Sequence, residues 1–186
     1  MKISRIVFVS LLLSACGITP QRQPEVAHYD LPGTPPDLSA PLRSLDVSPS
    51  TWMNGNAMYY RLAYAADGSR REQYGETRWS AQPADLIETR LKRGLIGNMG
   101  SEAAKGCRLH IDLDDFVQVF DAPEASRLQL DTRAALYDAS QNLLARKIFS
   151  LSRPAGSNAK SGVVASAEVT DDFAHQLQDW VRQSCH

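Results

Sequence analysis

The sequence predicts an α+β fold, in which an antiparallel meander sheet packs two helices on one of its faces. The first indication is the order of segments, because four strand-like stretches precede one helical stretch and three more precede a second. The second is the clean apolar–polar alternation over 126–138, which is typical of an antiparallel strand with one buried and one solvated face. The third is the turn-prone sequence between neighbouring strands, as at 67–69 and 138–142.

Four strands are expected before the first helix. The stretch 27–31 is short and alternating, which favours an edge strand, and Pro49 closes the next. An aromatic-rich strand follows the turn-prone Asn-Gly-Asn at 54–56. The turn Asp-Gly-Ser then makes the fourth strand the second arm of a hairpin. These four strands are predicted at 27–31, 42–50, 57–63 and 70–76.

A helix is predicted at about 83–98, where the apolar spacing changes to three or four residues. Pro83 suits a first helical turn, and Gly97 and Gly100 are expected to end the helix. Its acidic residues lie near the start and its basic residues near the end, which complements the helix dipole. The apolar face consists of Leu86, Ile87, Leu91, Leu95, Ile96 and Met99.

Three strands and a second helix complete the predicted domain. The alternation in 107–120 slips at Asp114–Asp115, which indicates a β-bulge. The strands 126–138 and 142–152 form a hairpin, and 153–162 reads as a polar loop. A helix is expected at about 162–184, with an inward face of Val163, Val164, Ala167, Phe173, Leu177, Trp180 and Val181. Trp79 and Trp180 are expected to be core anchors rather than sugar-binding platforms.

The N-terminal 15 residues have the organisation of a signal peptide. Lys2 and Arg5 precede an apolar run that ends in small residues, and the run is too short for a membrane span, which needs about 20 residues. The tetrapeptide Leu-Ser-Ala-Cys at 13–16 matches the bacterial lipobox, in which Cys16 receives a diacylglyceryl group and, after cleavage, an N-acyl chain. The alternative is an ordinary signal peptide with an incidental cysteine. Gly17, where an Asp would favour inner-membrane retention, favours the periplasmic face of the outer membrane.

The rest of the chain divides into a tether and one domain. Residues 16–26 read as a lipidated, flexible N-terminus and 27–186 as a single domain. The net charge is −1 and no basic run exceeds two residues, which argues against a nucleic-acid partner. Cys107 and Cys185 remain for an oxidising compartment, which favours a disulfide, with two unpaired thiols as the alternative. The histidines and cysteines lack metal-ligand spacing, so neither a metal nor another cofactor is expected beyond the lipid.

Catalytic motifs are not evident in the sequence. Asp112 and Asp114 share a strand face near His110, but a solvated strand face explains them better than paired acid–base catalysis. No nucleophile elbow or phosphate-binding loop is found, and we expect a protein that is not an enzyme. Tyr59 and Tyr60 occupy adjacent strand positions, so one should point inward and one outward. The outward tyrosine, Arg61 and the neighbouring hairpin are the expected partner-binding surface; the alternative is that the outward tyrosine is merely exposed.

Several motifs between about residues 28 and 183 occur in an order that is similar to that of a known protein family. They are Tyr60-Arg61, a hairpin ending in Tyr74, Trp79 four residues before Pro83, a Leu-rich helix, Leu113, Phe116 and Phe120 on one strand, and a final Trp180-Val181 pair. In this order the chain resembles the ABC-type transport auxiliary lipoprotein family, which includes the paraquat-inducible protein C lipoproteins. The cysteine pair is not a hallmark of that family.

The resemblance implies a function that composition does not. It implies a non-catalytic outer-membrane auxiliary subunit of an MCE-type ABC system that moves phospholipid or other hydrophobic molecules between the inner and outer membranes. The implied partners are a periplasmic MCE-domain protein and its inner-membrane permease and ATPase. A homo-oligomer would add avidity for a ring-shaped partner. The alternative is a structural or assembly lipoprotein that supports an outer-membrane protein or links envelope layers.

Overall fold

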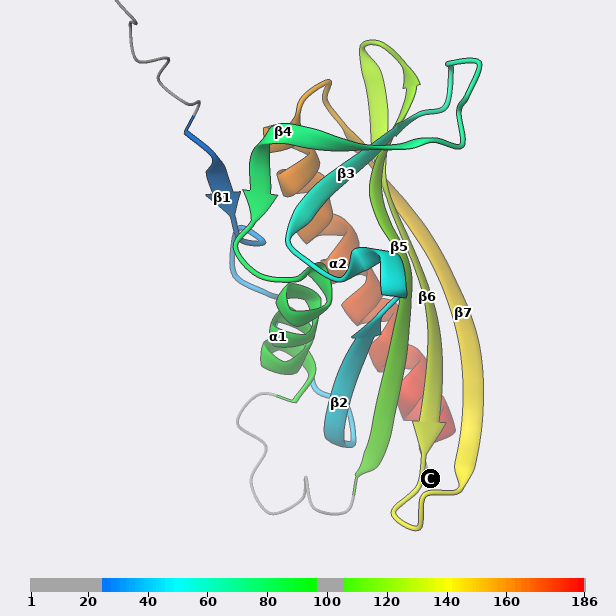
Figure 1. Ribbon diagram of the computed structural model, residues 1–186. Coiled ribbons are helices and arrows are strands. Elements are labelled where there is room, and N and C mark those ends of the chain that lie inside the picture. Colours follow the sequence, from blue (N-terminus) through cyan, green and yellow to red (C-terminus); the bar gives the residue numbers. More distant parts are fainter. Residues whose placement is uncertain (1–24, 97–105, 186) are drawn as a thin grey trace, which may run out of the picture.

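A seven-stranded mixed sheet and two helices make up the described part of the protein (Figure 1). The structure is a computed structural model, and it describes residues 25–96 and 106–185. The strands are β1 (Ala27–Tyr29), β2 (Leu42–Pro49), β3 (Ala57–Leu62), β4 (Arg71–Trp79), β5 (Cys107–Ala122), β6 (Ala125–Tyr137) and β7 (Leu143–Ala155). The helices are α1 (Pro83–Leu95) and α2 (Ala159–Ser184), with a short 3-10 turn, η1 (Thr51–Met53). The predicted α+β class is therefore confirmed.

Strand β5 is the centre of the sheet. The strand order is β1-β4-β3-β5-β6-β7, and β2 also pairs with β5. On one side, β6 pairs with β5 along nearly its whole length. On the other, β2 pairs with its first half and β3 pairs with Gln118, Val119 and Phe120 in its second half.

The expectation of a purely antiparallel meander is wrong. The pairs β1–β4, β2–β5 and β3–β5 are parallel, whereas β3–β4, β5–β6 and β6–β7 are antiparallel. Parallel neighbours require a long crossover rather than a tight turn. For β2–β5 and β3–β5, the segment that contains α1 is part of that crossover. It lies between β4 and β5 in the chain and allows β5 to run parallel to β2 and β3.

Several element boundaries also differ from the expectation. Strand β7 continues through Ala155, in the predicted polar loop, because Arg153 and Pro154 pair with Leu128 and Arg127 of β6. Helix α2 begins at Ala159, because the side chain of Asn158 caps its first turn. Helix α1 ends at Leu95, and the expected stop at Gly97 and Gly100, like Met99, lies outside the described residues. The bulge predicted at Asp114–Asp115 is confirmed by the register shift between Leu113 and Asp115.

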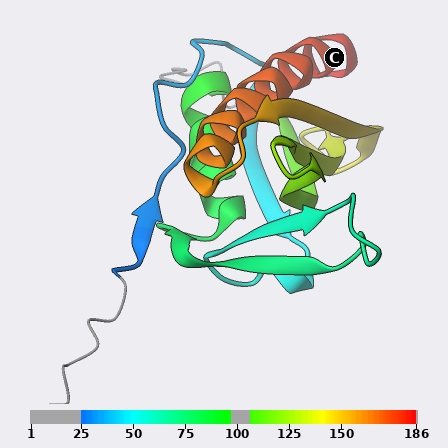
Figure 2. The same cartoon turned by 90° about the horizontal axis from the view of Figure 1, so that it is seen from above.

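The two helices cover one side of the sheet and contact each other there (Figures 1 and 2). They bury a single apolar cluster against the inward residues of β2, β5, β6 and β7. Trp79 and Trp180 are 3% and 8% exposed, so both are core residues as expected. Val164 is an exception to the predicted inward face of α2, since it is 48% exposed. Its position on the helix turns it away from the sheet that buries Val163.

A polar residue, Gln118 of β5, lies inside this core at 2% exposure. Its amide donates to Ser126 Oγ and to the Gly156 carbonyl, each at 2.8 Å, and its carbonyl oxygen accepts from the Tyr74 hydroxyl at 3.0 Å. Burial, with a smaller effect of the neighbouring Tyr60, raises the pKa of Tyr74 to about 12. That hydroxyl therefore remains a donor at any physiological pH. Gly162 gives Gln118 the room it needs, because a Cβ there would lie 2.2 Å from Gln118 Oε1.

Arg90 of α1 joins the two helices to the N-terminal segment. It is 7% exposed and donates to both carboxylate oxygens of Asp171 in α2, at 2.7 and 2.9 Å. The same guanidinium donates to the carbonyls of Pro32 and Gly33 at 3.0 and 3.2 Å. One side chain therefore fixes three segments that are distant in sequence.

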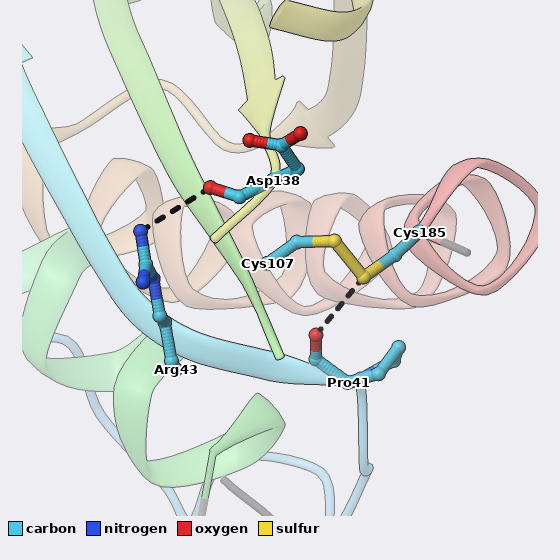
Figure 3. Close-up of a disulfide and its surroundings, with 5 residues drawn as sticks. All are labelled: Pro41, Arg43, Cys107, Asp138 and Cys185. Atoms are coloured by element: carbon cyan, nitrogen blue, oxygen red, sulfur yellow. Dashed lines mark hydrogen bonds between the residues drawn. A yellow bond between two sulfur atoms is a disulfide. The ribbon is translucent and has the colours of Figure 1, made fainter. Parts of the chain in front are cut away.

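The disulfide predicted between Cys107 and Cys185 is present (Figure 3). The two Cα atoms are 6.0 Å apart and the cysteines are separated by 78 residues. The bridge joins the start of β5 to the residue that follows α2. The carbonyl oxygen of Pro41, just before β2, accepts from the Cys107 amide at 2.8 Å and lies 3.4 Å from Cys185 Sγ. The disulfide thus attaches the residue after α2 to the end of the sheet where β5 begins.

Candidate functional site

We call the side of the sheet opposite the helices the helix-free face. It carries rows of polar and charged side chains. The registers align its side chains in rows across the strands. One row contains Asp46, His110, Ala135 and Arg146, from β2, β5, β6 and β7. The next row contains Ser48, Asp112, Arg133 and Ile148. The strict alternation along β6 places these residues outward while Leu136 and Ala134 enter the core.

His110 lies between two carboxylates on this face. Its Nδ1 contacts Asp46 Oδ2, and its Nε2 lies 3.3 Å from Asp112 Oδ1. Burial alone would lower the pKa of His110, but the hydrogen bond and charge of Asp46, together with Asp112, outweigh it and raise the pKa above its usual value. The charged imidazolium is therefore the favoured partner of both acids.

The carboxylates that sequence analysis considered for catalysis are held in ion pairs. Arg133 donates to both oxygens of Asp114, at 2.8 and 2.9 Å, and lies 3.7 Å from Asp112. Asp112 and Asp114 therefore share a face, as expected. Acidic and basic side chains therefore alternate across this face. Such ion pairs are typical of a protein surface, and the same groups can bind charged ligands. Over the described ranges 25–96 and 106–185, no group of three or more His, Cys, Asp or Glu side chains could hold a metal ion.

A second cluster on this face lies around η1 and β3. We call it the Trp52 cluster, and it consists of Trp52, Tyr59, Arg61, Arg71 and Asp115. The guanidinium of Arg71 lies 3.9 Å from the centre of the Trp52 ring, and the Tyr59 ring meets Trp52 edge-on at 5.3 Å. Both aromatic side chains are half-buried, so part of each ring remains open to solvent.

Asp115 holds the two arginines of the Trp52 cluster. Its carboxylate lies 2.9 Å from Arg61 and 3.3 Å from Arg71. Burial raises the pKa of Asp115 above its usual value, even though both arginines act to lower it. The β-bulge produces this arrangement, because the extra residue at Asp114 turns Asp115 to the side on which Arg61 lies.

The structure separates the three residues predicted to bind a partner. Tyr60 points to the helix side, where its ring packs against Tyr74 and Phe120 at 4.7 and 5.9 Å. Tyr59 and Arg61 both belong to the Trp52 cluster on the other face. The sequence reasoning missed Trp52 and Arg71. A tryptophan in a turn-rich segment directly before an aromatic strand was the available signal for Trp52.

Other sequence predictions concern residues beyond the described part of the chain. Cys16, the predicted lipidation site, and the signal peptide 1–15 lie outside the described residues, as does most of the tether 16–26. Among the helices that the structure describes, neither is both long and apolar enough to cross a membrane.

The architecture defines a class of α+β domain with a central long antiparallel pair, β5–β6, and two covering helices. Two solved structures share it. A Xanthomonas campestris protein assigned to DUF330 matches with a TM-score of 0.63 and 17% identity, covering 86% of this chain and 93% of its own. An uncharacterised protein matches with a TM-score of 0.63 and 12% identity, covering 84% of this chain and 99% of its own. At these identities the likeness establishes the fold.

The remaining comparisons add little. A lipoprotein candidate from Caulobacter crescentus covers 53% of this chain and 83% of its own, at 16% identity and a TM-score of 0.38, too partial a likeness to define a shared fold. No family model and no curated protein matches the chain.

Proposed function

We propose that this chain is a lipid-anchored lipoprotein on the periplasmic face of the outer membrane, acting as a non-catalytic auxiliary subunit of an MCE-type ABC transport system. The lipobox at Cys16 and the ordered motifs over 28–183 support this proposal. The system would move phospholipid or other hydrophobic molecules between the two membranes. Its MCE-domain protein, permease and ATPase would be the partners of this chain.

The observation that carries a docking role is the composition of the Trp52 cluster. Protein interfaces are enriched in tryptophan, tyrosine and arginine, and a few such residues usually dominate the binding energy. Trp52, Tyr59 and Arg71 combine on this part of the helix-free face, and Asp115 fixes the arginines in place. The cluster therefore presents a preorganised surface to a protein partner.

The tether sets how far that surface can reach. As a flexible chain, residues 16–26 would span about 20 Å between the lipid on Cys16 and the domain. Two or more acyl chains hold a protein stably on a membrane. The domain would then be confined close to the outer membrane, where it could meet the far end of a periplasmic tube but could not cross the periplasm alone. Several copies around a ring would strengthen that contact through avidity.

The test is a pull-down of the lipidated protein from detergent-solubilised envelopes, with mass spectrometry of the recovered proteins. We expect the wild type to recover an MCE-domain protein. Trp52→Ala and Arg71→Gln should reduce that recovery by about tenfold or more, the effect of losing one interface hot spot. Lys160→Gln, an exposed cation on α2, is the control and should leave recovery unchanged.

Other results would contradict the proposal. Recovery of a β-barrel protein without an MCE-domain protein would favour the assembly alternative, and recovery of neither would also count against a transport role. If both variants recover the partner as well as the wild type does while unfolding at the same urea concentration, the Trp52 cluster is not the docking surface.

A further inference from the structure

The helix-free face contains a groove of about 670 Å³ between β5, β6 and β7. This volume is in the range of pockets that bind small molecules. It lies away from the Trp52 cluster, toward the end of the sheet where β5 begins and β6 ends. The side chains that line it include His110, Arg133, Ala135, Tyr137, Arg146 and Ile148.

A single small residue explains why the sheet is hollowed here. Ala135 lies at the centre of the groove, with His110 beside it on β5 and Arg146 beside it on β7. Along β6, Arg133 and Tyr137 point to the same side two residues before and after it. Four large side chains therefore surround a methyl group, which forms the floor.

The groove has apolar side chains at its two ends. Ile148 is 75% exposed, the highest value among the large hydrophobic side chains that the structure describes. It stands on the edge strand β7 at the rim of the groove. Tyr137, on the other side of Ala135, is held by Arg108, whose guanidinium lies 4.9 Å from the ring centre. An exposed isoleucine at one end of the alanine floor and a tyrosine ring at the other offer apolar surface for an alkyl chain.

The groove also contains a cation that has no carboxylate partner. Its one lining acid, Asp112, is engaged by His110 and Arg133. Arg146, in contrast, has no carboxylate within salt-bridge distance among residues 25–96 and 106–185. Arg146 is exposed on the edge strand β7, so the open edge of the groove is cationic.

We propose that this groove binds an anionic amphiphile, a molecule with a negatively charged head group and an alkyl chain. The head group would accept hydrogen bonds from Arg146, and the chain would lie over Ala135 against Tyr137 and Ile148. This site is separate from the docking surface proposed above, and the charge and shape of the groove support it whether or not the transport role holds. Either proposal can therefore fail without the other.

The experiment is a titration of the purified protein with dodecyl phosphate below its micelle concentration, followed by calorimetry. Two companion probes separate the parts of the ligand. Dodecyltrimethylammonium has the same chain with the opposite charge, and inorganic phosphate has the head group alone. We expect saturable binding of dodecyl phosphate at one site and at least tenfold weaker binding of both companions, about the effect of one charge-assisted hydrogen bond.

Two variants locate the site. Arg146→Gln removes the unpaired cation, and Ala135→Phe fills the floor without changing any charge. Each should weaken dodecyl phosphate binding by at least about tenfold, as expected for one charged hydrogen bond or a filled pocket. Lys160→Gln, on α2, is the matched control and should bind as the wild type does. Urea unfolding of each variant shows whether the fold is retained.

Three results would overturn the proposal. One is the absence of saturable dodecyl phosphate binding by the wild type. Another is equal binding of inorganic phosphate, which would make the groove a simple anion site, or of the cationic amphiphile, which would indicate non-specific adsorption. The third is wild-type affinity in a folded Ala135→Phe variant, since a ligand in the groove could not tolerate that side chain.

Discussion

Removal of the Cys107–Cys185 disulfide should destabilise the domain without changing its fold. The change is the double substitution Cys107→Ala and Cys185→Ala. For cysteines separated by 78 residues, the chain-entropy treatment gives about 4.5 kcal/mol, and native bridges typically contribute about 2–4 kcal/mol. The bridge acts mainly on the unfolded chain, which is why the loop length sets the magnitude. Some loss of packing at Cys107, which is 4% exposed, adds to the effect.

Urea unfolding followed by circular dichroism measures this effect. With a slope of about 2 kcal/mol per molar urea, the midpoint should fall by about 1–2 M. Wild-type protein treated with a thiol reductant is the control that leaves every side chain in place, and it should show most of the same shift. The reductant should not change the unfolding of the double variant.

An unchanged midpoint in both the variant and the reduced wild type would refute the reasoning. It would mean that the last turn of α2 is held to β5 by packing alone and that the bridge does not restrict the unfolded chain. A shift in the variant without one in the reduced wild type would assign the effect to packing at Cys107 instead.

Three further predictions concern polar side chains and their partners. Gly162→Ala gains about 1 kcal/mol of helix propensity, but its methyl displaces Gln118 and leaves buried groups unpaired at about 1–3 kcal/mol each. We therefore expect a lower urea midpoint, and a midpoint at or above the wild-type value would contradict this account. Arg90→Met leaves the half-buried Asp171 without its partner and should cost about 1–3 kcal/mol, whereas Arg93→Met, on the exposed side of α1, should be near neutral by the same assay. The raised pKa of His110 means that its ion pairs stabilise the fold fully below the unfolded pKa of about 6.5 and lose that effect as the pH rises through the folded pKa. His110→Gln should abolish this part of the pH dependence, and an NMR titration that gives His110 a pKa below its usual value would refute the assignment.

Local periodicity predicted much of the fold. The alternation along 126–138 identified β6 and its buried face, and the slip at Asp114–Asp115 identified the bulge. These predictions succeed because a strand's period of two is set by its own backbone and does not depend on its neighbours. The end of β7 was missed for the opposite reason, since its polar residues become a strand only through pairing with β6.

The candidate sites depended far less on local pattern. The outward tyrosine and Arg61 were proposed from their strand positions, but the inclusion of Trp52 and Arg71 depends on how η1 and β4 pack beside β3. The alternation rule did show that Tyr59 and Tyr60 point to opposite faces. It could not show which of the two faces the helices cover.

By itself, the sequence determined the α+β class, the strands and helices in their order, and the cysteines available for a bridge. These follow from residue spacing and composition, which act over a few residues at a time. Only the tertiary structure decided that β2 and β3 lie parallel to β5, that Asp46 meets His110, and that Ala135 becomes the floor of a groove. Such contacts join positions far apart in the chain, and the energy that selects them comes from burying one shared core, which no single stretch of sequence contains.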